Sequence, residues 1–533
     1  MIAIEGKRIE EVFDEAVSRW GERDFLVAPQ RDGAPMRSLT YAATAAEVAR
    51  LAGALSAAGY GAGHRIAVCV GTCPEHYLLK LAMARLGISF VPVNPDYRPG
   101  ELAYVLEDSG AVLGIADAAR AGLMRAAMEA GGRARFGALE EMGSLPEAGF
   151  AAPGSEGGPL AEAGLLYTSG TTGQPKGCIM SHEYELMIGG VYPGIALTQP
   201  ISESDRVFNP LPAFHVNAGV VSFIGVMLVG AAQIQPERFS ASTWWRDLGE
   251  TRATLFHYLG VVIAVLLADR EAGPELLGDI RAGLGAGVEP ALHVEFERRF
   301  GIPLIEVWGM TEMCRVMVMD EEPRHTDTRA FGRARPDLEV QVWDDAGREC
   351  PRGQPGEMVM RHSEETPRKG FFSGYLNKLD ATVEAWRGGW FHTGDTVVMD
   401  EAGILYFVDR KKNIIRRAGE NIAAAEVENV LMGDERVVNV ACVAVPDEVR
   451  EEEVLAAIVL DKAVPQTRET ALSIFTQAFE KLSYYKAPGW ILFVDELPVT
   501  GTQKVVKHKL FEPGEDPRQR AGIFDFRKLK KKG

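Results

Sequence analysis

Apolar residues follow two different spacings along the first hundred residues of the chain. In residues 8–19 they recur every three or four positions, which is the spacing of an amphipathic helix. In residues 65–70 and 90–93 they form short continuous runs, which are typical of buried strands. Helical segments at residues 75–86 and through Leu55 alternate with these strands. The alternation predicts an α/β fold in which layers of helices surround a parallel sheet.

The pattern of strands and helices starts afresh at Val437. Apolar runs at residues 437–443 and 454–460 predict strands, and residues 472–482 predict a helix. This pattern suits a separate α+β domain of roughly 120 residues, which is an ordinary domain size. The expected fold is therefore a large N-terminal domain of layered α/β subdomains followed by a small C-terminal α+β domain.

Composition narrows the range of functions. The chain has 533 residues, of which 46% are hydrophobic and 25% charged, as in a globular protein of more than one domain. Its formal net charge of −17 argues against nucleic acid as the main partner. The 6 cysteines are scattered without a C-x-x-C pair, so we expect reduced thiols in a cytoplasmic protein. No run typical of a signal peptide opens the sequence, and its apolar stretches are too short for a membrane span.

One stretch concentrates hydroxyl groups, glycines and a lysine. Residues 165–177 read Leu-Leu-Tyr-Thr-Ser-Gly-Thr-Thr-Gly-Gln-Pro-Lys-Gly. The apolar start predicts a strand end, and the glycines predict a loop whose N–H groups, hydroxyls and lysine can hold phosphate oxygens. The stretch is not a Walker loop, because Pro175 precedes Lys176 and Gly177 follows it. A polar surface loop is the alternative, but such loops rarely combine these residue types in this order.

Other stretches contain residue types suited to a nucleotide or an acid. They are residues 207–217 with Phe214 and His215, 281–287 with Gly283, Gly285 and Gly287, 306–312 ending in Thr311 and Glu312, 389–395 ending in Asp395, 406–415 with a charge cluster, and 497–506 with Lys504. A strand end made of glycines lets a flat ring lie against the backbone. Thr311 can donate a hydrogen bond to phosphate, and Asp395 can accept both hydroxyls of a ribose. Taken singly, His215 would be a packed loop histidine and Lys504 an exposed lysine.

These motifs, in this order, resemble those of the adenylate-forming superfamily, which contains acyl-CoA synthetases, the adenylation domains of peptide synthetases, and luciferases. The resemblance covers nearly the whole chain. It implies that a carboxylate attacks the α-phosphate of ATP, giving an acyl-adenylate and pyrophosphate. A thiol, usually that of coenzyme A, then displaces AMP.

The resemblance also implies how the chain is divided. We expect an N-terminal AMP-binding domain at residues 1–411 and a mobile C-terminal domain, which carries the catalytic lysine, at residues 412–511. A basic extension follows at residues 512–533. We predict that this extension is a solubilising or docking tail without a chemical role.

Individual residues receive roles from the same resemblance. The expected ATP and AMP site consists of Thr168, Ser169, Gly170, Thr171, Thr172, Gly173, Lys176, Gly285, Ala286, Gly287, Trp308, Gly309, Met310, Asp395 and Arg410. The expected acyl pocket consists of Phe214, His215, Asn217 and Cys314. The expected catalytic residues are Lys504, Glu312 and Thr311, and Glu312 is also the expected Mg²⁺ ligand. Lys412 is the expected hinge, and Gly419, Glu420 and Asn421 form the expected segment for the thiol step.

Charge explains why these residues suit the implied reaction. A carboxylate that approaches a polyphosphate meets like-charge repulsion, which Mg²⁺ on Glu312 and the lysine and N–H groups of the loop would offset. Lys504 would bridge the carboxylate and the α-phosphate and hold them in line. Rotation about Lys412 would then exchange Lys504 for the Gly419 segment. One departure from the superfamily is Gln503, which stands where glycine is usual and makes the loop before Lys504 stiffer.

The identity of the acid is the least determined part of the prediction. Residues 212–215, 407–410 and 419–421 look most like crotonobetaine/carnitine–CoA ligases. Trp308 is bulky where the superfamily often has tyrosine, which favours a short or medium, polar acid over a long fatty chain. An aromatic acid is an alternative. Adenylation by a peptide synthetase is disfavoured, because the sequence shows neither a carrier domain nor a pocket aspartate for an α-amine.

Two further functions stay open at this point. The first is an acyl-AMP ligase that loads a carrier protein in place of coenzyme A. The second is a non-catalytic nucleotide-binding relative, against which the presence of Glu312, Asp395 and Lys504 argues. The expected cofactors and partners are ATP, Mg²⁺, coenzyme A and a carboxylic acid, with no nucleic acid and no integral membrane segment. A homodimer is one oligomeric state compatible with the resemblance.

Overall fold

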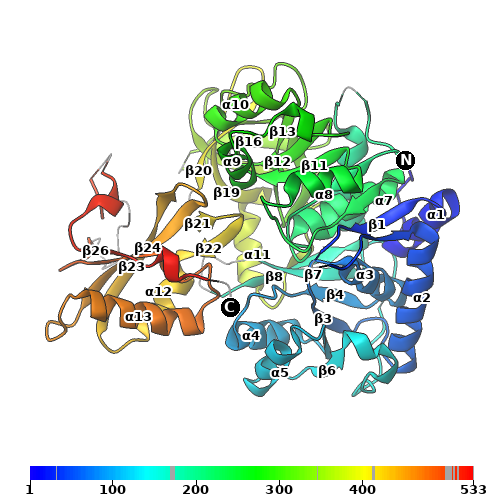
Figure 1. The fold of residues 1–533 in the computed structure, drawn as a ribbon, viewed down its shortest axis with the longest axis horizontal. Helices are drawn as coiled ribbons and strands as arrows, with labels where there is room; N and C mark the ends of the chain where they lie inside the picture. Colours follow the sequence, from blue (N-terminus) through cyan, green and yellow to red (C-terminus); the bar gives the residue numbers. More distant parts are fainter. Residues whose placement is uncertain are drawn as a thin grey trace. The chain divides into compact units, whose positions relative to one another are not determined.

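The structure of the chain is a computed structural model, shown as a ribbon in Figure 1. It describes all residues except 32, 156, 169–173, 198, 345, 411–413, 499–506, 508, 509, 513, 514, 532 and 533. For residues 409, 410, 414, 421, 423, 425 and 429 it describes the backbone alone. The chain divides into two units. One contains Met1–Pro95, Val105–Tyr167 and Gly177–Lys411, and the other contains Asp96–Tyr104, Thr168–Lys176 and Lys412–Gly533.

The largest sheet of the first unit has the strand order β14-β13-β12-β11-β9-β10-β1-β2. Its strands are β1 (Asp24–Ala28), β2 (Arg37–Thr40), β9 (Arg206–Phe208), β10 (Ala232–Ile234), β11 (Leu255–Leu259), β12 (Ala282–Ala286), β13 (Leu304–Met310) and β14 (Met313–Val318). The strands from β13 to β1 in this order pair in parallel, and β2 and β14 add antiparallel strands at the two ends. The parallel order brings the carboxyl ends of β11, β12 and β13 together at one side of the sheet.

A second sheet has the order β18-β8-β7-β4-β3-β5-β6, and a third has the order β15-β20-β19-β17-β16. The strands of the second are β3 (Arg65–Cys69), β4 (Ser89–Pro92), β5 (Leu113–Ala116), β6 (Arg135–Ala138), β7 (Glu162–Thr168), β8 (Lys176–Ser181) and β18 (Gly374–Tyr375). Those of the third are β15 (Ala330–Gly332), β16 (Glu339–Trp343), β17 (Gly356–Arg361), β19 (Phe391–Met399) and β20 (Leu405–Arg410). The strands predicted at residues 65–70 and 90–93 are therefore confirmed as β3 and β4, which pair in parallel.

Helices cover these sheets, and their ends follow the local sequence. The helices up to residue 400 are α1 (Ile9–Trp20), α2 (Tyr41–Ala57), α3 (Pro74–Leu86), α4 (Pro99–Ser109), α5 (Ala121–Glu129), α6 (His182–Gly189), α7 (Phe223–Val229), α8 (Trp244–Thr251), α9 (Gly260–Ala268), α10 (Pro290–Phe300) and α11 (Leu379–Ala385). Thr40 caps α2, because its hydroxyl accepts the N–H of Ala43. Proline opens α3, and Gly87 ends it in the left-handed region with a φ of 66°.

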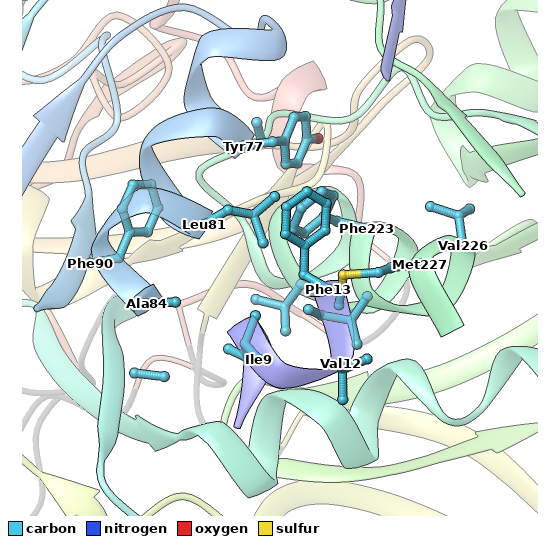
Figure 2. Close-up of a cluster of buried hydrophobic side chains, with 14 of the residues drawn as sticks. Ile9, Val12, Phe13, Tyr77, Leu81, Ala84, Phe90, Phe223, Val226 and Met227 are labelled. Carbon is cyan, nitrogen blue, oxygen red and sulfur yellow. The ribbon is translucent and has the colours of Figure 1, made fainter. Parts of the chain in front are cut away.

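The core of the first unit gathers apolar side chains from α1, α3 and α7. Ile9, Val12 and Phe13 lie on one face of α1, as the three- and four-residue spacing predicts. Figure 2 shows Phe13 near Phe223 and Met227 of α7, with side chains of α3 such as Tyr77 and Leu81 around them. Removal of one such side chain from water contributes roughly 1.5–3 kcal/mol. The mixed α/β fold expected of the N-terminal region is confirmed.

The second unit contains a sheet with the order β22-β21-β24-β25-β26, and β23 also pairs with β24. Its elements are β21 (Ile414–Arg417), β22 (Glu420–Ala423), α12 (Ala424–Met432), β23 (Val437–Asp447), β24 (Glu451–Leu460), α13 (Arg468–Lys481), β25 (Trp490–Phe493) and β26 (Ile523–Asp525). The long β23–β24 hairpin and α13 confirm the strands and the helix predicted after Val437. The small α+β domain is thus present.

The basic extension is partly built into this second unit. β26 pairs in antiparallel fashion with β25, and Ile491 lies opposite Phe524. Phe526 is fully buried and stacks on Phe475 of α13 with ring centroids 5.1 Å apart. The prediction of a solubilising or docking tail is therefore wrong for residues 523–530. The strand to which this segment pairs lies some thirty residues earlier in the sequence, beyond the reach of a local pattern.

Across the described residues, we find no helix whose length and apolar character would suit a membrane crossing.

Candidate active site

The glycine-rich strand β12 lies between β11 and β13 in the large sheet. Gly285 pairs with Tyr258 on one side and with Glu306 on the other. A Cβ atom at Gly285 would lie 2.3 Å from the carbonyl oxygen of Tyr258, so only glycine fits this position. Gly287 has a φ of 73°, which also favours glycine. In the segment predicted to bind adenine, Gly285 is thus required by close packing against β11, whereas Gly287 has open space where a Cβ atom would lie.

Glu306 of β13 supports this segment, although its sequence pattern gave it no role. Its Oε1 accepts the hydroxyl of Tyr258 at 2.7 Å, and its Oε2 accepts the N–H of Gly287 at 3.0 Å. Burial raises the pKa of Glu306 to about 7, although the Tyr258 hydroxyl and the Gly287 N–H act in the opposite direction. The sequence alone does not reveal this contact, because it depends on the pairing of β11, β12 and β13 in the sheet.

Glu306→Gln is expected to change how stability depends on pH. An unfolded glutamate has a pKa of about 4.3, so between that value and about 7 the folded wild type holds more protons than the unfolded chain. The free energy of unfolding of the wild type should therefore fall as pH rises through this window, by at most about 1.4 kcal/mol per pH unit from this group. Chemical denaturation of the wild type and of Glu306→Gln at a series of pH values from 4.5 to 8 measures how the free energy of unfolding of each protein changes with pH.

The variant should lose this part of the slope, because an amide does not titrate. Its absolute stability should also drop, because Tyr258 and Gly287 donate to different oxygens of Glu306, and the NH₂ group that replaces one of them in glutamine cannot accept a hydrogen bond. Identical pH slopes in the two proteins would contradict a raised pKa at Glu306.

Thr311 and Glu312 form the turn between the antiparallel strands β13 and β14, in which Met310 lies opposite Met313. The Glu312 side chain is 7% exposed, and its Oε1 accepts the hydroxyl of Tyr375 at 2.9 Å. The backbone oxygen of Thr311 accepts the hydroxyl of Tyr184 at 2.8 Å. The turn is thus fixed from two sides, by β18 and by α6.

Trp308 joins the large sheet to the third sheet. Its indole N–H donates to Oδ2 of Asp395 at 3.0 Å, and both side chains are buried. Asp395 of β19 lies opposite Arg410 of β20 in the antiparallel register. The structure therefore brings together three residues predicted for the nucleotide site. The side chains of Trp308 and Asp395 are hydrogen-bonded, and the backbones of Asp395 and Arg410 are paired. Their sequence positions give no hint of this proximity, which depends on sheet register.

The predicted phosphate loop connects two neighbouring strands of the second sheet, β7 and β8. Thr168 ends β7 and Lys176 begins β8, while Ser169, Gly170, Thr171, Thr172 and Gly173 lie outside the described residues. Gly177 packs against the ring of Tyr167, where a Cβ atom would approach to 3.1 Å. β8 also pairs with β18, which places Cys178 opposite Tyr375, the tyrosine that binds Glu312. The prediction of a strand end before the loop is confirmed.

The residues predicted for the acyl pocket lie in different surroundings. The rings of Phe214 and His215 are 4.5 Å apart, and Asn217 accepts a hydrogen bond from Asn209 at 2.9 Å. Cys314 is buried in the core, and burial raises the pKa of its thiol to about 12. His215 lines a small cavity together with Phe90 of β4 and Met180 of β8.

The wall of this cavity also contains charged and polar side chains from α3. His76 and Lys80 line it, and Lys80 is paired with the buried Glu185 of α6 at 2.7 Å. Burial lowers the pKa of His76 to about 3, and the Lys80 charge adds to this effect. His76 is therefore neutral at ordinary pH. Sequence reasoning missed both α3 residues, because each looks like an ordinary helical position.

The remaining predicted residues belong to the second unit. Gly419 and Glu420 stand at the turn between β21 and β22, and Asn421 continues into β22. Gly419 has a φ of 85°, so the glycine is needed by the turn itself. Lys412 and Lys504 lie outside the described residues, and their roles stay predictions.

Comparison with known proteins identifies the family. Residues 13–376 match the family described as AMP-binding enzyme, and residues 426–504 match the AMP-binding enzyme C-terminal domain. A crotonobetaine/carnitine–CoA ligase of Salmonella arizonae is 26% identical over 532 residues, which cover 96% of this chain and 100% of that protein. A sulfoacetate–CoA ligase of Cupriavidus necator is 30% identical over 515 residues, which cover 94% of this chain and 98% of that protein.

Solved structures agree with these matches. An o-succinylbenzoate CoA synthetase from Bacillus subtilis superposes with a TM-score of 0.80 at 25% identity, covering 94% of this chain and 97% of that one. An amide bond synthetase from Marinactinospora thermotolerans also has a TM-score of 0.80, at 24% identity, and supports the fold alone. The predicted superfamily and the predicted pair of a large AMP-binding domain and a small C-terminal domain are confirmed. The chain belongs to the AMP-binding enzyme family and is an AMP-forming acid–thiol ligase of the adenylate-forming type.

Proposed function

We propose that the protein is an ATP-dependent carboxylate–CoA ligase that acts on a short or medium-length, polar carboxylic acid. One arrangement carries this proposal: Trp308 near the end of β13 holds Asp395, and the turn that follows the same strand presents Glu312. Residues 308–312 would therefore position both the proposed ribose acceptor, Asp395, and the proposed Mg²⁺ ligand, Glu312. The AMP-binding match covers Trp308 and Glu312.

In the first half-reaction, a carboxylate oxygen forms a bond to the α-phosphorus of ATP. The bond from that phosphorus to the bridging oxygen of the β-phosphate breaks, and pyrophosphate leaves with the electron pair. Asp395 would bind the ribose hydroxyls together with Arg410, and Gly285 to Gly287 would receive the adenine ring. Lys504 would hold the carboxylate and the α-phosphate in line, and its charge would favour the transition state.

Glu312 is the residue that would hold Mg²⁺. Mg²⁺ in phosphate sites usually takes one or two carboxylates and keeps phosphate oxygens and waters as its other ligands, so a single buried glutamate fits it. In the part of the chain that the structure describes, no group of three metal-ligating side chains forms a site without substrate. We therefore expect the ion to enter with ATP, where it supplies positive charge to the phosphates.

In the second half-reaction, the deprotonated thiol of coenzyme A attacks the acyl carbon. A sulfur–carbon bond forms, the bond between that carbon and the adenylate oxygen breaks, and AMP leaves. The segment Gly419 to Asn421 would serve this step after a rotation about Lys412. The N-terminal and C-terminal domains proposed for this motion are residues 1–411 and 412–511, with 512–533 as an extension.

Two relatives support a polar acid. By their names, one acts on crotonobetaine or carnitine and another on sulfoacetate, which are small acids that carry a second charged or polar group. The indole of Trp308 is fixed by its hydrogen bond to Asp395 and packs against Phe331, with ring centroids 5.8 Å apart. A bulky, fixed indole at this position leaves less room for a long chain than a smaller ring would. An aromatic acid is the second candidate, because one structural relative is a synthetase for o-succinylbenzoate.

Pyrophosphate release across a panel of acids tests the proposal. The panel contains small polar acids, fatty acids of increasing length and aromatic acids, each with ATP, Mg²⁺ and either coenzyme A or a carrier protein. Mass spectrometry identifies the thioester formed. Acid-dependent pyrophosphate release with a CoA thioester product is the expected result. Thioester on the carrier protein alone would favour the acyl-AMP ligase, and no release with any acid would overturn the proposal.

Lys412→Pro is expected to slow the thiol step more than adenylation. Proline fixes the φ angle of the residue about which the domain is proposed to rotate, and so hinders the change between the two half-reactions. Pyrophosphate exchange measures adenylation, and thioester formation from supplied acyl-adenylate measures the thiol step. Lys412→Ala removes the same charge but leaves the backbone free, and should retain both activities. An unchanged ratio of the two rates in the proline variant would remove Lys412 from the hinge role.

A further inference from the structure

The turn between β21 and β22 is the part of the second unit that the proposed function assigns to the thiol step. Arg417 and Glu420 pair across the hairpin, and Ala418 and Gly419 form its tip with φ values of 50° and 85°. Two successive residues with positive φ are typical of a tight two-residue hairpin turn. This conformation costs free energy at Ala418, because a residue with a Cβ atom disfavours positive φ. The tip therefore needs support from its surroundings to keep this conformation.

Support comes first from the backbone at the start of β24. The N–H of Ala418 donates to the carbonyl of Arg450 at 3.0 Å, and Arg417 lies opposite Glu451 in the sheet. The N–H of Arg416 donates to the Glu452 carboxylate at 2.6 Å. The hairpin is thus fastened to β24 on the side of Arg417.

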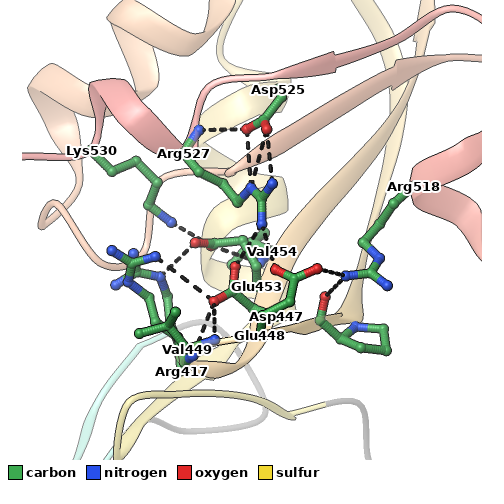
Figure 3. Close-up of polar contacts among 12 residues, drawn as sticks. Arg417, Asp447, Glu448, Val449, Glu453, Val454, Arg518, Asp525, Arg527 and Lys530 are labelled. Atoms are coloured by element: carbon green, nitrogen blue, oxygen red, sulfur yellow. Dashed lines mark hydrogen bonds and ion pairs between the residues drawn. The ribbon is translucent and has the colours of Figure 1, made fainter. Parts of the chain in front are cut away.

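A buried charge cluster continues this support into the core. Glu453 of β24 is fully buried, and its Oε2 accepts the Nε of Arg417 at 2.7 Å. Its Oε1 accepts the N–H of Val454 at 2.9 Å and the ammonium of Lys530 (Figure 3). Lys530 also donates to the carbonyl of Tyr485 at 3.2 Å. One carboxylate thus connects the hairpin to the last described turn of the chain.

Lys530 is held in this place by the residues before it. Phe526 is buried, and its N–H donates to the carbonyl of Gly489 at 2.8 Å. Arg527 donates to Asp447 at 2.9 Å (Figure 3). Its guanidinium also lies over the ring of Trp490, 4.3 Å from the ring centroid. The Lys530 side chain has no solvent exposure, whereas Lys528 two residues earlier is exposed. The C-terminal domain match ends at residue 504, so this anchor lies beyond the matched residues.

Burial of three charges is expensive, so a cluster of this kind contributes little to stability compared with apolar packing. It does fix geometry, because each partner has one low-energy position once water is excluded. We propose that Lys530 is a positioning residue for thioester formation: through Glu453 it holds Arg417, and Arg417 holds the tip at Ala418–Gly419 in the form that receives the thiol. This inference rests on the proposed function.

The test uses the full-length chain and compares Lys530→Met with Lys528→Met. Lys530→Met removes the cation that shares Glu453 with Arg417, and Lys528→Met removes an exposed lysine from the same short turn. We expect Lys530→Met to raise the KM for coenzyme A by about tenfold, because a change of this size corresponds to the loss of roughly one charge-assisted hydrogen bond. Acid-dependent pyrophosphate exchange should stay close to wild type. Lys528→Met should change neither value.

The possible outcomes distinguish a failure of the positioning role of Lys530 from a failure of the proposed ligase function. If the wild type shows no acid-dependent pyrophosphate exchange, the proposed function fails. If the wild type is active but Lys530→Met leaves the KM for coenzyme A unchanged, or lowers exchange and thioester formation equally, the positioning role is overturned. If Lys530→Met does not fold, Lys530→Gln, which keeps a donor for Glu453 without the charge, is measured in the same way and judged by the same outcomes.

Discussion

Lys504→Ala is expected to abolish pyrophosphate exchange while thioester formation from supplied acyl-adenylate continues. The lysine is proposed to stabilise the charge that develops when the carboxylate meets the α-phosphate, and loss of one such group typically lowers a rate by roughly 10²–10³-fold. The thiol step does not need this contact, because its acyl-adenylate is already formed. Exchange of labelled pyrophosphate into ATP and mass spectrometry of the thioester measure the two half-reactions separately.

Lys507→Ala is the matched control for this experiment. Lys507 lies three residues later and binds Glu428 at 2.6 Å, so its loss should affect the local ion pair and leave exchange near the wild-type rate. An equal loss of both half-reactions in Lys504→Ala would contradict its assignment to adenylation. Exchange at the wild-type rate would contradict any catalytic role.

Glu312→Gln is expected to have the second largest effect. Glutamine keeps the size of the side chain and can still accept the Tyr375 hydroxyl, but it lacks the charge that would hold Mg²⁺. Exchange should fall by roughly 10²–10³-fold, and the concentration of Mg²⁺ needed for half-maximal exchange should rise. Titration of Mg²⁺ at fixed ATP in the exchange assay measures both quantities.

Tyr375→Phe provides the comparison for Glu312. It retains the carboxylate and removes only the hydrogen bond that the tyrosine donates to it, so exchange should fall by no more than about tenfold. If Glu312→Gln shows the wild-type requirement for Mg²⁺, Glu312 does not bind the ion. If the phenylalanine variant is as impaired as the glutamine variant, the position of the turn matters more than its charge.

Local patterns predicted most of the elements that surround the site. The spacing of Ile9, Val12 and Phe13 predicts a buried helical face, and these residues lie in the core of the first unit. The glycines of residues 281–287 predict a strand end that receives a flat ring. The structure gives Gly285 a different reason, because a Cβ atom there would meet the Tyr258 carbonyl of the neighbouring strand. The helical face follows from neighbouring residues along the chain, so the sequence is sufficient there, whereas the need for glycine at position 285 depends on the pairing of β12 with β11.

Contacts between distant segments were beyond such patterns. The hydrogen bond from Trp308 to Asp395 and the pairing of Asp395 with Arg410 depend on the register of separate strands. The same holds for Glu306, whose carboxylate reaches the Gly287 N–H of the neighbouring strand. The basic residues at the C-terminus suggested a solvated tail, but Lys530 is buried, where its ammonium group pairs with the carboxylate of Glu453 on β24. A charge predicts exposure only when no partner is within reach.

The pairing of β26 with β25 has a consequence for shortened forms of the protein. β25 is the apolar sequence Trp-Ile-Leu-Phe, and β26 supplies hydrogen bonds to its outer side. A chain that stops where the family match ends, at residue 504, would leave open N–H and C=O groups along the three apolar residues that β26 pairs with, Trp490 to Leu492. Such an unprotected strand edge is a template for pairing between molecules. Truncated versions should therefore self-associate, whereas the full chain carries its own protecting strand.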